Sequence, residues 1–266
     1  METEQYIIRG GIEGRERLRI LSRVMQPTTL ELLRRAGLKP GLSCLEIGCG
    51  GGDVACDMAR MVGANGQVLA TDIDGPQLDI ARREAEAQRI ANLRFIQSDI
   101  TREIPDGPFD FIHMRFVLTH IPNPGDALTR IRSVLKPGGV IALEEIDFSG
   151  HFCHPDCPAL WRYVELYTET VKRRGGDANI GPRLPSLTLA AGFSNVGMNV
   201  VQRAGHEGEV KLITPITMQN IAPAVLRAGI ASEAEINAIV QELYDYAHTP
   251  GTIGCLARVF EVWATA

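Results

Sequence analysis

A glycine-rich turn at residues 46–53 constrains this chain more than any other segment. Its sequence is Glu-Ile-Gly-Cys-Gly-Gly-Gly-Asp. An apolar stretch precedes the turn and apolar residues at helical spacing follow it, which indicates a buried strand, a turn and a helix. Glycine allows a sharp turn with positive φ, and the missing Cβ lets a ligand approach the main-chain N–H groups. The pattern predicts a nucleoside-binding turn in an α/β fold. The alternative is a tight turn that binds nothing.

A second carboxylate stands where a ribose would lie. Residues 67–71 predict the next buried strand, which ends at Asp72. A carboxylate at this position can accept hydrogen bonds from both hydroxyls of a ribose. Asp74 is the other candidate, but it precedes Gly75-Pro76 and a periodic apolar stretch, as a helix N-cap does. We therefore expect Asp72 to bind the ligand and Asp74 to cap a helix.

The turn resembles the first motif of the class I S-adenosylmethionine-dependent methyltransferases, which reads acidic-x-Gly-x-Gly-x-Gly. Four residues carry the match: Glu46, Gly48, Gly50 and Gly52. Dinucleotide enzymes have a glycine at the position of Asp53, so a nicotinamide dehydrogenase is disfavoured. No Lys or Arg lies between residues 42 and 59. Such a segment suits a cationic sulfonium better than a phosphate.

Further segments resemble the third, fourth and fifth strands of this family, in the family's order: 95–100, 109–115 and 135–143. The resemblance covers about residues 40–147. It implies a doubly wound, Rossmann-like α/β fold with a seven-stranded sheet of order 3-2-1-4-5-7-6 and helical lid insertions. It also implies S-adenosyl-L-methionine as the cofactor.

The same resemblance implies a set of cofactor contacts. Asp99 would accept a hydrogen bond from the adenine amine and the N–H of Ile100 would donate to a ring nitrogen, unless Asp99 only caps a turn. For Tyr6 and Gln26, in the N-terminal lead, packing is the alternative to a contact. The other expected contacts lie in and after the predicted strands: Glu46, Gly48, Cys49, Gly50, Asp72, Ile73, Gln77 and Arg115.

Catalysis of methyl transfer depends mainly on holding the acceptor in line and excluding water, so a base is optional. If the acceptor must lose a proton, we expect His120 or Asp147 to take it, because both follow predicted strands. His113 lies within a strand, where a core histidine is expected. These assignments stay hypotheses at this stage.

The chain is expected to form one domain, residues 1–266, around a cofactor-binding core at 38–147. Lead helices occupy residues 1–37, with separate helices predicted at 13–25 and 30–36. Insertions at 148–181 and 209–248 are expected to meet as a lid that selects the substrate. Strands are predicted at 196–201 and 255–263.

The first insertion holds two clusters with alternative interpretations. An aromatic helix contains Trp161, Tyr163 and Tyr167, which either face the acceptor or anchor the helix. Upstream, four side chains could ligate zinc, but their spacing matches no familiar zinc site, so we assign no metal: His151, Cys153, His154 and Cys157.

Composition excludes some partners. The chain has 27 basic and 32 acidic residues, a net charge of −5, and its basic pairs are scattered, unlike a nucleic-acid footprint. No apolar run approaches the ~18 residues of a membrane span, and no signal peptide is visible, so we expect a cytoplasmic protein without membrane contact. The six cysteines are expected to be reduced thiols.

The sequence thus favours a methyltransferase that acts on a small molecule at an O, N or C nucleophile. A methyltransferase of RNA or protein and an S-adenosylmethionine-binding protein without methyl transfer remain alternatives. The acceptor, and whether the chain forms a homodimer, stay open.

Overall fold

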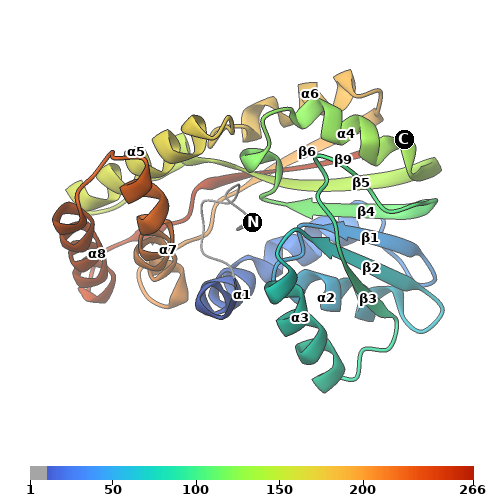
Figure 1. Ribbon diagram of the computed structural model, residues 1–266, viewed down its shortest axis with the longest axis horizontal. Helices are drawn as coiled ribbons and strands as arrows, with labels where there is room; N and C mark the ends of the chain where they lie inside the picture. Colours follow the sequence, from blue (N-terminus) through green and yellow to red (C-terminus); the bar gives the residue numbers. More distant parts are fainter. Residues whose placement is uncertain (1–10) are drawn as a thin grey trace.

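The computed structural model describes residues 11–266, and side chains from residue 14 onward (Figure 1). Its centre is a seven-stranded sheet of order β3-β2-β1-β4-β5-β9-β6. The strands are β1 (Ser43–Ile47), β2 (Gln67–Asp72), β3 (Leu93–Gln97), β4 (Phe109–Arg115), β5 (Leu135–Asp147), β6 (Ser194–Val201) and β9 (Arg258–Thr265). Strands β1 to β5 are parallel, and β9 runs antiparallel to β5 and β6. Because β9 is the last of the seven strands along the chain and β6 the sixth, the expected strand order is confirmed.

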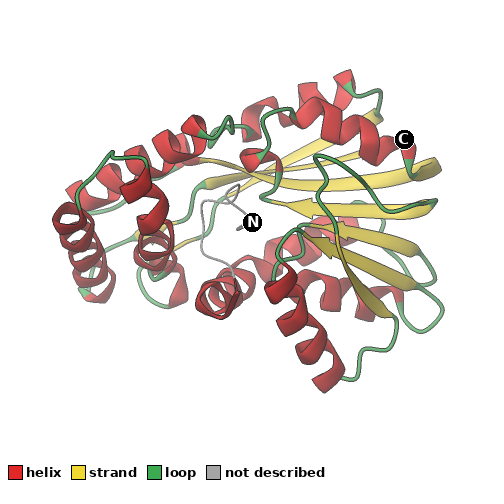
Figure 2. Cartoon of the chain, viewed as in Figure 1, coloured by secondary structure: helices red, strands yellow, loops and turns green. Residues whose placement is uncertain are grey.

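Helices cover both faces of the sheet (Figures 1 and 2). One face carries α1 (Gly11–Arg35), α2 (Asp53–Val62) and α3 (Gly75–Ala87), and the other carries α4 (Pro124–Ser133) and α6 (Leu184–Ala190). Successive side chains of β1 point to opposite faces of the sheet, since Cys44 packs in one core and Leu45 in the other. Burial on both faces explains why apolar residues of this strand, such as Cys44 and Leu45, point to both sides of the sheet.

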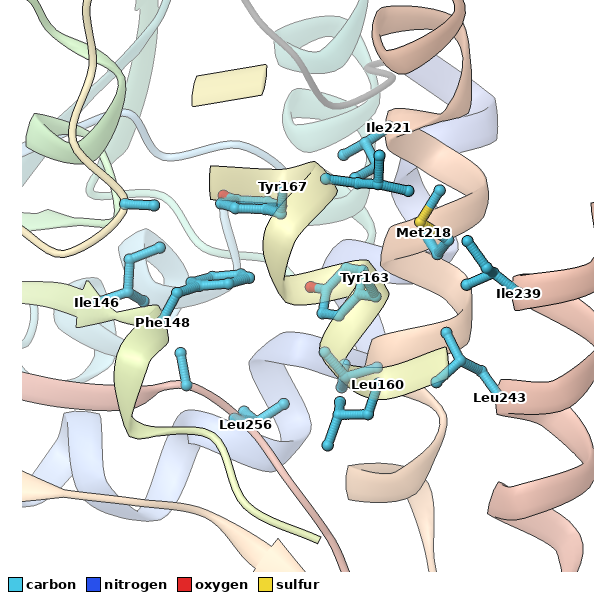
Figure 3. Packing of buried hydrophobic residues seen from close by; sticks show 14 of the residues in the cluster. Ile146, Phe148, Leu160, Tyr163, Tyr167, Met218, Ile221, Ile239, Leu243 and Leu256 are labelled. Carbon is cyan, nitrogen blue, oxygen red and sulfur yellow. The ribbon is translucent and has the colours of Figure 1, made fainter. Parts of the chain in front are cut away.

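Three helices gather beyond the carboxyl ends of the parallel strands: α5 (Pro158–Arg173), α7 (Ile213–Arg227) and α8 (Glu233–His248). We call them the lid. Their apolar side chains form a third core, shown in Figure 3. The second insertion contains two helices because Gly229, with φ +63°, interrupts it and the Ser232 side chain caps α8 by accepting the N–H of Glu235.

The lead differs from the expected pair of helices. A single helix, α1, runs from Gly11 to Arg35 with Pro27 inside it. Proline removes one helical hydrogen bond and normally kinks or ends a helix. Here Met25 before the proline and Leu32 and Leu33 after it are all buried, so packing on both sides holds the helix together.

Several predicted boundaries also shift. The third strand ends at Gln97, so Asp99 lies in the following turn. The last sheet strand begins at Arg258 and not at 255, because residues 254–255 form β8 (Gly254–Cys255), which pairs with β7 (Ala204–Gly205). Short 3-10 turns complete the chain: Leu118–His120, Phe148–Gly150, Gly181–Arg183 and Glu209–Lys211. Among the described helices, none is both long enough and apolar enough to cross a membrane.

Candidate functional site

The glycine turn leaves β1 and enters α2 with its backbone exposed to a cavity. Gly48 has φ +71°, and a Cβ there would lie 2.3 Å from Cγ2 of Val117, so this position requires glycine. The end of β2 fixes the turn, because the Cys49 N–H donates to the Thr71 carbonyl and the Gly50 N–H donates to Asp72 Oδ2 at 2.8 Å. These two hydrogen bonds fix the turn in the conformation in which its backbone faces the cavity.

Asp72 and Asp74 have different hydrogen bonds. Both oxygens of Asp72 accept main-chain N–H groups, Oδ2 from Gly50 and Oδ1 from Asp74. Burial raises the pKa of Asp72, whereas these N–H groups act to lower it. The Asp74 side chain accepts the N–H of Gln77 and caps α3, as expected. Asp72 therefore supports the turn as well as facing the cavity.

A cavity of about 420 Å³ extends from the glycine turn to the lid. It is in the size range of small-molecule sites. Most of the predicted site residues line it: Glu46, Gly48, Cys49, Gly50, Asp72, Ile73, Gln77, Asp99, Ile100, Arg115 and His120. The segments that supply them extend from residue 46 to residue 120, and the parallel sheet brings them together at one edge.

A buried chain of polar groups lies under this edge. His113 Nε2 is 3.1 Å from Glu144 Oε1, and His113 Nδ1 is 3.6 Å from Glu46 Oε1. Burial acts to lower the pKa of His113, but these two carboxylates raise it overall. His113 is thus the core histidine that its strand position predicts. Glu46 Oε2 is buried and has no hydrogen-bond partner, and Glu46 lines the cavity.

Two arginines reach the cavity although the glycine segment has none. Arg115 Nη1 donates to Thr29 Oγ1 at 3.0 Å, and its guanidinium lies over the Phe116 ring. Arg17, from α1, donates through Nε to Thr217 Oγ1 of α7 at 3.0 Å. Arg17 is not among the site residues expected from the sequence. No local sequence pattern predicts that Arg17 lines the cavity, because its position depends on how α1 packs against the lid.

Aromatic rings form the lid side of the cavity. Phe148 and Tyr167 stack with ring centroids 3.9 Å apart, and Tyr163 lies 5.8 Å from Phe148 (Figure 3). Trp161 points away from the cavity, is 39% exposed and donates to Asp156. Two of the three aromatic residues of this helix therefore line the cavity.

The chain was compared with known proteins. Residues 38–172, half of its length, match the family model described as a methyltransferase domain. The chain belongs to this family of methyltransferases. It is a class I S-adenosylmethionine-dependent methyltransferase by family. The C-methyltransferase UbiE of ubiquinone and menaquinone biosynthesis from Azotobacter vinelandii is 35% identical over 150 residues, 56% of each chain. The chain spans about half the length of the curated relatives that it matches.

Solved structures share the fold of this methyltransferase. A Bacillus halodurans protein superposes with a TM-score of 0.61 at 19% identity, over 89% of this chain and 97% of that one. Phosphoethanolamine N-methyltransferase 2 of Haemonchus contortus, solved with S-adenosylhomocysteine, gives a TM-score of 0.59 at 16% identity, over 93% of this chain and 56% of that one. At these identities the likeness concerns the fold alone.

Two predicted site residues of the described part of the chain do not line this cavity. Gln26 is exposed and its amide donates to Asp57 Oδ2 of α2 at 2.8 Å, because it lies on the α2 side of α1. The Asp147 carboxylate accepts a hydrogen bond from the Ser149 hydroxyl, and its Oδ2 lies 2.6 Å from Arg258 Nη2. It therefore stabilises the end of β5. Tyr6 lies outside the described residues.

The His/Cys segment of the methyltransferase does not converge on a metal. His151 lines the cavity and its Nδ1 is 2.9 Å from the Phe148 carbonyl, while Cys157 packs in the lid core. The backbone of His154 pairs with Ile253. Within residues 14–266 no group of three or more His, Cys, Asp or Glu side chains could hold a metal ion.

Proposed function

We propose that this chain binds S-adenosyl-L-methionine and methylates a small-molecule acceptor held under its lid. One observation carries the proposal: the glycine turn, Asp72 and the aromatic lid wall line a single cavity. A cofactor at the turn and an acceptor at the rings would share this space. The UbiE relative, a C-methyltransferase by name, supports a small acceptor.

The residues at the turn fit this cofactor. Asp72 faces the cavity, where its carboxylate would accept hydrogen bonds from the ribose hydroxyls of a nucleoside. The unpartnered Oε2 of buried Glu46 would accept a hydrogen bond from an ammonium group. Carboxylates on this side of the cavity favour a cation over a phosphate. When bound, the cofactor supplies an already activated methyl group.

The chain's own part in catalysis would be positioning. His120 lines the cavity, but burial lowers its pKa to about 3, so it is neutral and a weak proton acceptor near pH 7. Asp147 is engaged by Arg258 and lies outside the cavity lining. We therefore assign rate enhancement to the lid rings and strand ends, which would orient the acceptor and exclude water.

The test has two stages. Calorimetry with S-adenosylmethionine and S-adenosylhomocysteine should give one site per chain. Incubation with quinols, phenols, amines and RNA, followed by mass spectrometry, should then show a product heavier by one CH2 only among the small acceptors. Failure to bind either adenosyl compound rejects the proposal. Binding without any product favours a protein that holds the cofactor without methyl transfer, and methylated RNA favours a macromolecular substrate.

A further inference from the structure

Arg17 is an unusual residue in this cavity. It belongs to α1, is only 8% exposed, and lines the cavity beside the lid. Its one hydrogen bond in the described structure uses Nε, which donates to Thr217 Oγ1. A guanidinium carries four further N–H donors on its two terminal nitrogens. These donors have no partner among the described side chains.

Arg15, the other buried arginine of the described residues, is neutralised by carboxylates, because it pairs with Asp53 at 2.6 Å and also with Glu84. Arg115 is half-buried and donates to the Thr29 hydroxyl, which in turn donates to Glu144 at 2.9 Å, so only a hydroxyl links it to a carboxylate. In the part of the chain whose side chains are described, Arg17 has no such carboxylate, and a buried charge without a counter-charge is costly.

The electrostatic effect of Arg17 is seen in its neighbours. Burial is the main reason that the pKa of His120 is lowered, and Arg17 lowers it further. Burial raises the pKa of Tyr163, and Arg17 acts in the opposite direction. His120, Tyr163 and Thr217 all line the same cavity. Arg17 therefore stands inside the cavity, on its lid side.

We infer that Arg17 is the anchor for the acceptor and that the acceptor is a small organic monoanion, a carboxylate with an apolar or aromatic body. The inference rests on the proposed function and names the substrate class of that site. A planar guanidinium fork matches a carboxylate in two parallel hydrogen bonds. A single cation without a carboxylate partner among the described side chains balances one negative charge, which disfavours a phosphate dianion. The walls around it suit the apolar body: Leu21, Phe148, Tyr167 and Ile213.

The carboxylate of the cofactor itself is the competing ligand for Arg17. The neighbouring Leu18 contacts the glycine turn, since a Cβ at Gly50 would lie 3.3 Å from Leu18 Cδ1. Adjacent helix positions point about 100° apart. Leu18 thus faces the cofactor end while Arg17 faces Thr217 of α7. This geometry favours the acceptor, and the experiment separates the two ligands.

The test measures binding of aryl and alkyl monocarboxylates, each against its neutral amide, by calorimetry at saturating S-adenosylhomocysteine. 3-Phenylpropionate and 3-phenylpropanamide form the first pair. The native chain should bind carboxylates about tenfold or more tightly than amides. Arg17→Met should abolish this preference, and Arg17→Lys should retain part of it. Arg23→Met is the matched control, because Arg23 lies on the same helix, half exposed, and pairs with Glu209.

Two further readouts separate the outcomes. S-adenosylhomocysteine affinity should change less than about threefold in all variants; a larger loss in Arg17→Met would assign Arg17 to the cofactor and overturn the inference. Without ligand, Arg17→Met should raise Tm because it removes a buried charge that has no carboxylate partner among the described side chains. A lower Tm would mark Arg17 as a structural residue and overturn the inference. A native chain that binds S-adenosylhomocysteine but prefers no carboxylate rejects this inference alone, while one that binds neither rejects the proposed function.

Discussion

At the scale of single residues, two aspartates show how position decides role. Asp72 ends β2 and holds the glycine turn through the Gly50 N–H, whereas Asp74 caps α3. Their side chains are identical and two residues apart. Only the hydrogen bonds that each accepts distinguish a ligand-side carboxylate from a helix cap.

Asp72→Ala should therefore weaken S-adenosylmethionine binding roughly tenfold to a hundredfold, the equivalent of about 1.5–3 kcal/mol for hydrogen bonds to a charged group. Asp74→Ala should instead lower the free energy of unfolding by about 1 kcal/mol, as a lost cap does, with a smaller effect on affinity. Calorimetry and urea unfolding of both variants make the comparison. Equal affinities for the native chain and Asp72→Ala would remove Asp72 from the site.

Glu145 provides a pH-dependent prediction. Its buried carboxylate accepts four hydrogen bonds from residues 117–119, just before His120. Burial raises its pKa from 4.5 to about 7, so the folded chain binds this proton more tightly than the unfolded chain does. Its contribution to stability is present below about pH 4.5 and is lost as the pH rises through 7, by up to about 3 kcal/mol.

Glu145→Gln should lack this titration. Between pH 4.5 and 8 the native chain should lose stability relative to the variant, as measured by urea unfolding at each pH. Subtracting the variant removes the contributions of His113, His120 and His151, which titrate in both proteins. Exposed Glu86→Gln is the control. Parallel stability profiles for the native chain and Glu145→Gln would contradict the shifted pKa.

At the scale of elements, α5 separates its aromatic residues between core and solvent. Tyr163 and Tyr167 are four residues apart and share the buried face, while Trp161 lies on the other side. The same two rings therefore both anchor the helix and shape the cavity. From the sequence, facing the acceptor and anchoring the helix are alternatives.

Tyr167→Ala should cost about 3–5 kcal/mol of stability, because it opens a cavity beneath the stacked Phe148 ring. It should also lower kcat/KM for the acceptor, while cofactor affinity stays within a few-fold. Trp161→Ala, on the same helix, should change stability by about 1 kcal/mol or less. Thermal unfolding and cofactor titration of both variants check these expectations. Equal losses of stability in Tyr167→Ala and Trp161→Ala would contradict the assignment of Tyr167 to the buried face and Trp161 to the exposed face.

At the scale of the whole molecule, α1 connects the cofactor core to the lid. Arg15 binds Asp53 of α2 and Glu84 of α3, Arg17 binds Thr217 of α7, and Arg23 binds Glu209. The first half of this one helix thus contacts both walls of the cavity.

Saturation with S-adenosylhomocysteine should consequently slow hydrogen exchange in α1 and α7 as well as in the glycine turn. Ligand at about 100 times its Kd stabilises the folded state by about 2.7 kcal/mol. Local unfolding of each segment that contacts the ligand becomes less frequent as a result. Exchange measured by mass spectrometry gives the map. Protection confined to residues 46–77 would show that the lid is not coupled to cofactor binding.

The sequence by itself determined the core of the fold and the glycine turn at the edge of its sheet. Glycines at 48, 50 and 52, the carboxylate of Asp72 and the Asp74 cap depend on local backbone geometry and on short spacings, which the linear order contains. Strand order followed from the resemblance over about residues 40–147. Boundaries moved where pairing with a distant strand decides them, as at Arg258.

Only the tertiary structure decided what the lid contributes. Gln26 faces α2, Asp147 is held by Arg258, and Arg17 enters the cavity, and each outcome depends on a partner at least 30 residues away in sequence. Local patterns carry no information on such partners. Burial then lowers the pKa of His120 and keeps it neutral, because desolvation exists only once the helices have packed.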